Sequence, residues 1–404
     1  MRVYRNLSQI VTLKGAFDKD GRHLVPADLS LIHDGAIAFD DDKILWVGED
    51  NDLPSEFQGL NSFDGAGFVL TPGLVDSHTH LVFAGNRARE YSDRLNGADY
   101  QAIAQKGGGI LHTTTKTLAS SEDELFQLGV ERLERMLSYG IKAVELKSGY
   151  ALTREGELRL LRVAARLKKH FKTKLTLIST YMGAHAVPAS YKSSEEFVTH
   201  VVLPTMQEAH AQGLIDCVDV FHEQGYFSSQ DVERVFAAAH SLNLPCKIHA
   251  DEFQDNDGAA LAARHGALSA DHLLKASTAG INALARSSTV ATLLPGTAFF
   301  LGKDLPPARA MLDAGCKVAI ASDYNPGSSH VDNLLLVASI AAPTLKLNQA
   351  ELWSAMTLNA AAAIGLKNRG ALAPGLIPSF SLFKAGDVSE ITYNWGLSLS
   401  CPLP

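Results

Sequence analysis

The chain has 404 residues, 46% of them hydrophobic and 20% charged, which is the composition of a soluble globular protein with room for one large α/β domain and a smaller appendage. Its net charge of −8 argues against a nucleic-acid partner, and no apolar run approaches the about 18 residues of a membrane span. The first residues, MRVYRNLSQIVTLKG, lack the apolar core of a secretory signal, and the four cysteines form no CxxC pair, so we expect a cytoplasmic protein without disulfides or a thiolate zinc site.

The first predicted elements are antiparallel strands. Residues 31–50, LIHDGAIAFDDDKILWVGED, form two alternating runs around acidic turn residues. A buried strand is expected next in residues 71–77, TPGLVDS. From about residue 120 to 325, amphipathic helical stretches alternate with short β-branched runs, as in residues 121–140 followed by 141–146. This alternation predicts βαβ units and a parallel sheet.

The strand count favours a barrel. About eight strands with intervening helices fit between residues 68 and 325, which is typical of a (β/α)₈ barrel; a doubly wound open sheet is the alternative. Residues 366–404 hold few helix signals and include SFSLFKAG and ITYNWG, which we interpret as β structure. We therefore predict an α/β protein with a TIM-like barrel at residues 68–365 and a small composite β domain made of residues 1–67 and 366–404.

Local signals mark the helix boundaries. Starts of capping-box form are expected at Ser121 with Glu124 and at Ser193 with Glu196, and a weaker one at Ser228 with Asp231. Glycines predict the stops, namely Gly140, Gly213, Gly280 and Gly315.

Titratable side chains follow almost every predicted barrel strand. At the carboxyl ends of the strands, where barrel active sites lie, the sequence places His78, His80, Glu145 to Tyr150, His185, His249, Asp271, His272 and Asp323. His78 and His80 are two residues apart, so on an extended strand both imidazoles point to one face. Together with a third histidine several strands later and an aspartate on the last strand, they form a His₃Asp set suited to Zn²⁺ or Fe²⁺.

Seven motifs carry a resemblance to a known family. They are PGLVDSHTHLVFAGNRAREY, GGGI, ELKSGYAL, YMGAHAVP, HADEF, DHL and SDYNPGS. The histidine and aspartate pattern alone resembles the amidohydrolase superfamily. ELKSGY, GAHAVP and SDYNPGS make the chain similar, within that superfamily, to the imidazolonepropionase family of histidine degradation.

The resemblance implies an activity, a cofactor and a ligand set. Members of the family open the ring of 4-imidazolone-5-propanoate to N-formimino-L-glutamate, the third step of histidine degradation. The cofactor implied is one divalent metal per chain, Zn²⁺ or Fe²⁺/Fe³⁺, held by His78, His80, His249 and Asp323. The partner implied is this small molecule, with neither nucleic acid nor membrane; the oligomeric state stays open, with a homodimer as the expectation.

The resemblance also implies substrate contacts. Arg87 and Tyr150 would hold the substrate carboxylate, His185 and Glu252 would contact the ring, and Asn325, Gly327 and Ser328 would line the product end of the pocket. Arginine suits this role, because its planar guanidinium can donate two parallel hydrogen bonds to a carboxylate.

A proton carrier is needed beside the metal. A divalent cation lowers the pKa of a water that it binds. Asp323 would then accept a proton from the attacking water and return it to the leaving nitrogen, and His272 would orient the water.

Each of these roles has a plainer alternative. Arg87 could be a solvated loop charge, Tyr150 a packed aromatic, Glu252 a cap for a helix starting near Asp255, His185 a hydrogen-bond donor to its own loop, and Asn325 with Gly327 simple turn residues.

Lys147 falls where some relatives carry a carboxylated lysine that bridges two metals; we favour a structural role, paired with Glu145 or another buried carboxylate. Residues 106–110, KGGGI, are expected to cover the substrate.

Two other functions stay open. A deaminase of the same superfamily acting on a nucleobase-like ring would share the metal site and differ in the pocket. A non-catalytic assembly barrel would have lost its metal ligands, which an intact His₃Asp set argues against.

Overall fold

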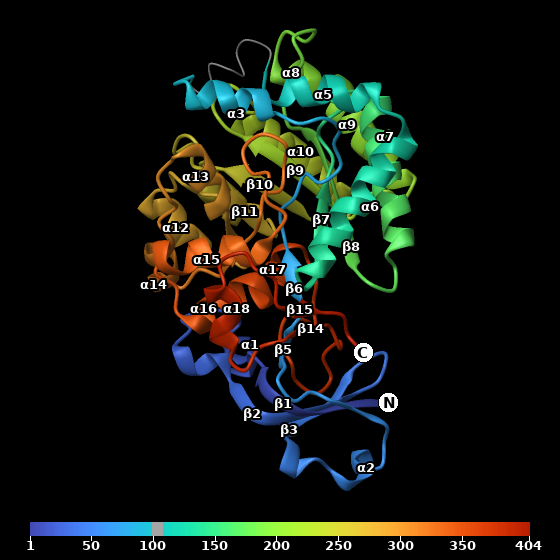
Figure 1. Ribbon diagram of the computed structural model, residues 1–404. Helices are drawn as coiled ribbons and strands as arrows, with labels where there is room; N and C mark the ends of the chain where they lie inside the picture. The colour runs from blue at the N-terminus through green and yellow to red at the C-terminus, as the bar shows by residue number, and fades with distance from the viewer. Residues whose placement is uncertain (99–107) are drawn as a thin grey trace.

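Eight parallel strands form a barrel at the centre of the molecule. The computed structural model describes residues 1–98 and 108–404 (Figure 1). Neighbouring strands follow one another in chain order: β6 (Leu74–Asp76), β7 (Ile141–Lys147), β8 (Thr176–Ala184), β9 (Cys217–His222), β10 (Cys246–Ala250), β11 (Ser269–His272), β12 (Val290–Leu293) and β13 (Val318–Ile320). All but three of the 41 strand residues are buried, as expected of parallel strands covered on both faces. The predicted barrel is therefore confirmed.

The barrel closes just beyond the carboxyl ends of its first and last strands, β6 and β13. The Asp323 amide donates to the His78 carbonyl at 3.0 Å, and the His80 amide donates to the Tyr324 carbonyl at 2.9 Å. Thr79 and Tyr324 form the parallel bridge between these bonds. Closure thus brings the two histidines of the HxH pair beside Asp323, which is 245 residues away from His78 in sequence.

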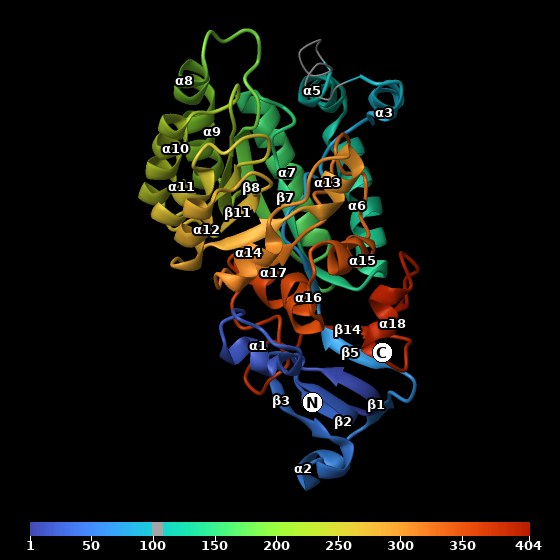
Figure 2. The ribbon, with the colours of Figure 1, turned by 90° about the vertical axis from the view of Figure 1, so that its left-hand side faces the viewer.

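Helices surround the barrel (Figure 2). They are α3 (Ala88–Leu95), α5 (Ile110–Ala119), α6 (Glu122–Ser138), α7 (Arg154–His170), α8 (Ser194–Phe197), the short π-helix Val198–Val202, α9 (Leu203–Ala211), α10 (Ser229–Ser241), α11 (Gly258–Arg264), α12 (Thr278–Ala285), α13 (Pro295–Leu301), α14 (Ala308–Asp313), α15 (Leu334–Thr344), α16 (Gln349–Met356) and α17 (Leu358–Ala363). Among the described residues, none of the helices has the length and apolar character needed to cross a membrane.

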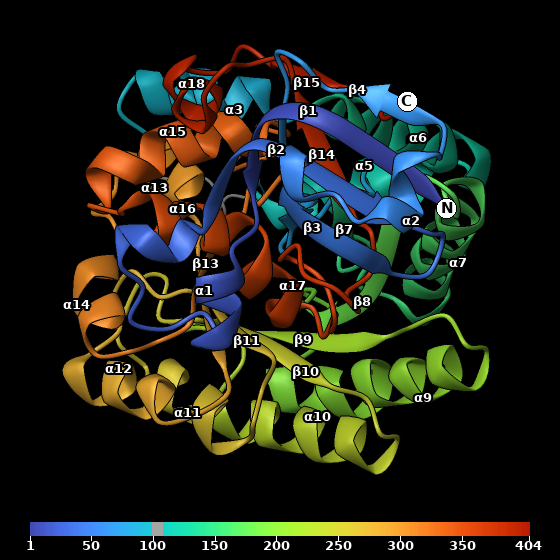
Figure 3. The same cartoon turned by 90° about the horizontal axis from the view of Figure 1, so that it is seen from below.

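A second sheet takes strands from both ends of the chain, as predicted. Its order is β15-β14-β5-β1-β2-β3, with β4 paired to β1. The strands are β1 (Arg2–Val11), β2 (Leu31–Phe39), β3 (Ile44–Glu49), β4 (Ser62–Asp64), β5 (Val69–Pro72), β14 (Phe380–Phe383) and β15 (Ser400–Cys401). Short helices accompany them: α1 (Lys14–Asp18), Pro26–Leu29, Asp50–Asp52, α2 (Ser55–Gln58) and α18 (Val388–Tyr393). Figure 3 shows this sheet lying across the barrel end opposite the site described below. The domain boundaries at residues 67 and 366 stay a prediction.

The single strand predicted at TPGLVDS is two strands. Gly73 separates β5, which belongs to the terminal sheet, from β6, which belongs to the barrel. The Gly73 amide donates to the Ser379 carbonyl at 2.8 Å, and a Cβ at Gly73 would lie 2.7 Å from the side chains of Lys142 and Ser379. Glycine is required here because the chain passes closely between the two sheets.

Most predicted helix boundaries are correct. Ser121 and Ser228 form capping boxes with Glu124 and Asp231, and Ser193 accepts from the Glu196 amide. Gly280 is an exception, since it lies in the first turn of α12 and its amide donates to the cap Ser277. The β interpretation of ITYNWG is also wrong.

The error at ITYNWG has a local cause. This stretch begins inside α18, which starts at a capping box between Asp387 and Glu390. The sequence DVSE carries the capping signal that starts this helix.

Candidate active site and metal centre

A cavity of about 490 Å³ lies at the carboxyl ends of the barrel strands. Ten of the twelve side chains predicted to form the site line it: His80, Arg87, Tyr150, His185, His249, Glu252, His272, Asp323, Asn325 and Ser328. Of the other two, His78 is fully buried beside His80, and Gly327 lies against Arg87. Residues 106 and 107 of the predicted covering loop lie outside the described residues, and Gly108, Gly109 and Ile110 line the cavity.

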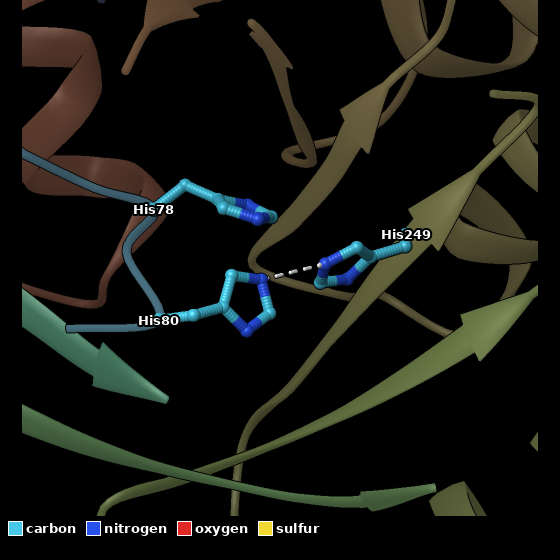
Figure 4. A group of neighbouring side chains, drawn as sticks. All are labelled: His78, His80 and His249. Atoms are coloured by element: carbon cyan, nitrogen blue, oxygen red, sulfur yellow. Dashed lines mark hydrogen bonds between the residues drawn. The ribbon is translucent and has the colours of Figure 1, made fainter. Parts of the chain in front are cut away.

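Three imidazoles and one carboxylate face a common point. His78, His80 and His249 turn toward one another in Figure 4. The Nε2 atoms of His80 and His249 are 3.3 Å apart, and Asp323 Oδ1 lies 3.5 Å from His78 Nε2 and 3.8 Å from His80 Nε2. Ligand atoms held at about 2.0–2.1 Å by a tetrahedral Zn²⁺ are roughly 3.3 Å apart, so these separations suit one divalent ion.

The protonation of these groups also fits a metal. Burial lowers the pKa of His78 and of His80 well below the usual range, so both imidazoles are neutral and carry a free lone pair. His78 Nε2 is buried and has no hydrogen-bond partner among the described residues. A buried, unsatisfied nitrogen beside a carboxylate is costly without a cation. The residues present therefore fit a divalent metal.

Asp323 is held in a constrained geometry. Its backbone has φ of +52°, and that of His272 has φ of +76°, a left-handed conformation that non-glycine residues adopt rarely and mainly at functional sites. The Thr297 hydroxyl donates to Asp323 Oδ2 at 2.7 Å, which leaves Oδ1 facing the histidines. Burial raises the pKa of Asp323 to about 6 in the metal-free protein. Thr297, which lies in α13 after β12, was not among the site residues predicted from the sequence.

Arg87 is buried, so the interpretation as a solvated loop charge is wrong. It is 4% exposed, precedes α3, and its Nε donates to the Thr113 hydroxyl of α5 at 2.9 Å. A Cβ on Gly327 would lie 2.1 Å from Arg87 Nη1, so the guanidinium rests directly on the Gly327 backbone. This contact gives Gly327 a role that the cavity lining alone does not reveal.

His185 and Tyr150 form one wall of the cavity. The His185 ring stacks on the His80 ring at a centroid distance of 5.0 Å, and the Tyr150 ring lies 5.2 Å from that of His185. His185 Nδ1 donates to the carbonyl of Gly149, which belongs to the preceding βα loop and not to its own. Burial lowers the pKa of His185 to about 3, so its ring is neutral and the Nε2 lone pair is available to a ligand.

Glu252 and His272 also line the cavity. Burial, and then the nearby Asp323 carboxylate, raise the pKa of Glu252 well above its usual range. His272 Nδ1 is 3.7 Å from Glu252 Oε1. Glu252 is not a helix cap: Asp251 accepts hydrogen bonds from the Gly258 and Ala259 amides at the start of α11.

Asn325 combines turn chemistry with a place in the cavity lining. Its Oδ1 accepts from the Gly327 and Ser328 amides, both at 2.8 Å, and its Nδ2 donates to the Ser328 hydroxyl at 2.9 Å. The turn interpretation of this segment is thus correct, and it explains how Asn325 and Ser328 reach the cavity together.

A model of the amidohydrolase family matches residues 69–396. With its barrel and its histidine cluster, the chain is an amidohydrolase, and so an enzyme. An adenosine deaminase from Xanthomonas campestris, solved with bound zinc, shares the fold with a TM-score of 0.71 at 17% identity, over 99% of this chain and 89% of that one.

Two curated relatives are much more similar. An imidazolonepropionase from Ralstonia nicotianae is 43% identical over 91% of this chain and 90% of its own length. One from Agrobacterium fabrum is 41% identical over 98% of this chain and 93% of its own length. The chain belongs to the imidazolonepropionase family.

Proposed function

We propose that this protein hydrolyses the cyclic amide of 4-imidazolone-5-propanoate to N-formimino-L-glutamate, with one divalent metal held by His78, His80, His249 and Asp323. The observation that carries the proposal is the convergence of these four side chains on one point at the edge of a cavity that also contains the buried Arg87. The family of the chain supports the choice of substrate.

The metal, when bound, lowers the pKa of a water molecule toward neutrality and polarises the ring carbonyl. Asp323 accepts a proton from the attacking water. The water oxygen bonds to the carbonyl carbon, the ring C–N bond breaks, and Asp323 delivers the proton to the departing nitrogen. His272, which also lines the cavity, orients the water.

The remaining cavity residues bind the substrate. Arg87 and Tyr150 hold the propanoate carboxylate, with Arg87 offering two parallel N–H groups. His185 accepts from a ring N–H through Nε2, and Glu252, whose pKa is raised by burial and by the nearby Asp323 carboxylate, contacts the ring. Asn325, Gly327 and Ser328 shape the end of the cavity where the opened product forms.

The native metal is Zn²⁺ or Fe²⁺. Three imidazole nitrogens and one carboxylate oxygen are ligands that both ions accept. Elemental analysis of protein purified without added metal distinguishes the two.

The substrate assignment is tested by product analysis. We expect 4-imidazolone-5-propanoate to disappear with formation of equal amounts of N-formimino-L-glutamate and no ammonia. Ammonia release from guanine or adenosine, with 4-imidazolone-5-propanoate left intact, would replace this assignment with that of a nucleobase deaminase.

Replacing Arg87 with lysine keeps the positive charge and removes the two parallel N–H donors of the guanidinium. If the carboxylate contact is equally strong in the ground and transition states, Arg87→Lys raises KM more than it lowers kcat. Steady-state kinetics measure both. Unchanged kcat/KM would exclude Arg87 from substrate binding.

Gly327→Ala tests the contact behind Arg87. The added Cβ would lie 2.1 Å from Nη1, so the guanidinium must move and KM should rise at nearly normal metal content. Gly59→Ala is the matched control, since a Cβ at Gly59 meets nothing within 4 Å. Equal KM values for both variants would contradict the role of Gly327.

We also propose that the protein is a homodimer. Large apolar side chains gather at exposed positions near the carboxyl terminus, where Tyr393, Trp395 and Leu397 are 85%, 61% and 63% exposed. Light scattering coupled to gel filtration should give twice the chain mass of 43.4 kDa, and a monomer at micromolar concentration would contradict this.

A further inference from the structure

Five fully buried charged side chains form a cluster inside the barrel, directly beneath the histidines. They are Glu145 and Lys147 of β7, Asp219 of β9, Lys247 of β10 and Asp271 of β11, each at most 1% exposed. Lys147 donates to Asp219 and lies 3.0 Å from Glu145 Oε2. Lys247 donates to Glu145 Oε2 at 2.8 Å and lies 3.3 Å from Asp271 Oδ2.

Two of the carboxylates contact the imidazoles on the side away from the metal position. Asp271 Oδ2 accepts from His78 Nδ1 at 2.6 Å, and Asp219 accepts from His249 Nδ1 at 3.2 Å. A proton on Nδ1 leaves the lone pair on Nε2, which is the atom that faces the other ligands in both residues. The carboxylates therefore select the tautomer that can bind a metal.

The lysines fix where these carboxylates lie. Lys147 bridges Asp219 and Glu145, so the carboxylate behind His249 cannot turn away from the ring. Lys247 also donates to the Ser77 carbonyl at 2.6 Å, which ties the backbone next to His78 to the same cluster. A buried ionic cluster of this kind gives little net stability compared with an apolar core, so stability alone does not account for it.

We propose that Lys147 and Lys247 are positioning residues that hold the imidazoles of His249 and His78, through Asp219 and Asp271, in the tautomer and orientation that bind the metal. This inference rests on the ligand set given under the proposed function. Carboxylates that contact metal-binding histidines are typically worth about 10–100-fold in metal affinity. The two lysines extend this support by one further layer.

Removal of a lysine has two opposite effects, and the sign of the result separates them. Lys147 is a cation close to a bound dication, so loss of its charge alone would tighten metal binding. Loss of positioning would weaken binding, because Asp219 would no longer be held against His249. A decrease in affinity therefore indicates positioning.

The experiment measures the Zn²⁺ dissociation constant of the metal-free protein by competition with a chromophoric chelator. We expect Lys147→Met and Lys247→Met each to bind Zn²⁺ about 10–100-fold more weakly than the original chain. Arg309→Met is the matched control, because it also deprives a buried carboxylate, Glu351, of its cation at 2.9 Å, but does so away from the site. Affinity equal to or tighter than that of the original chain would overturn the proposal.

A second variant tests the same proposal if Lys147→Met does not fold. Lys147→Met/Glu145→Gln removes one charge of each sign, so the net charge of the cluster is unchanged while Asp219 loses its anchor. It should also bind Zn²⁺ more weakly, and its Co²⁺ complex should show a shifted visible absorption band. Normal affinity with a normal Co²⁺ spectrum would overturn the proposal.

The outcome is separable from that of the proposed function. If the original chain binds no Zn²⁺, or if His249→Ala binds it equally well, the ligand set is wrong. If His249→Ala loses the metal and every lysine variant keeps it, only the positioning role fails.

Discussion

Asp323→Asn, compared with the original chain at one metal per chain, is expected to lose about 10²–10⁴-fold in kcat, the usual value of general acid–base catalysis. An aspartate that served only as a ligand could be replaced by asparagine, a neutral oxygen donor of nearly the same shape, with a moderate loss. A proton carrier could not. Because the proposed reaction needs Asp323 both to accept a proton and to return it, both transfers are lost.

The comparison depends on metal occupancy. Asn binds a divalent ion more weakly than Asp, so kcat must be divided by the measured metal content. Asp304→Asn is the control, since Asp304 is an exposed carboxylate that pairs with Lys275 and is not part of the cavity lining. If Asp323→Asn kept kcat within about tenfold of the original value, the proton-carrier role would fail, and His272 or His185 would take its place.

His249→Ala is expected to lose most of its metal, and with it the activity. His249 supplies the Nε2 that lies 3.3 Å from that of His80, so its removal deletes one of the four proposed ligands. The measurement is elemental analysis after dialysis, with activity assayed on the same sample. His200→Ala, at an exposed position outside the cavity, should keep the metal content of the original chain. A fully metallated His249→Ala protein would count against the ligand set.

The fold was predictable because its signals are local. Alternation of amphipathic helices with short apolar strands indicates a parallel barrel, and serine caps mark helix starts such as Ser121. The break at Gly73 was not predictable, because it depends on contacts with Lys142 and Ser379, which lie far along the chain. The start of α18 was predictable as well, because its capping box between Asp387 and Glu390 is a local signal.

The candidate site was predictable where chemistry coincides with strand ends. His78, His80, His249 and Asp323 follow barrel strands whose carboxyl ends must meet. Only part of the charged cluster beneath them was predicted from the sequence. Lys147 was expected to pair with Glu145, and the structure adds Asp219 as a second partner. The pairing of Asp271 with His78 joins residues 193 positions apart, and it depends on the register of the closed barrel.

Titration of the metal-free protein with Zn²⁺ or Fe²⁺ in the presence of 4-imidazolone-5-propanoate tests the central claim most directly. Substrate absorbance follows the rate, and N-formimino-L-glutamate is measured in the same sample. We predict negligible activity without metal, a linear rise to one equivalent per chain, and no further rise beyond it. Full activity in the metal-free protein, or a requirement for two equivalents, would contradict a one-metal hydrolase.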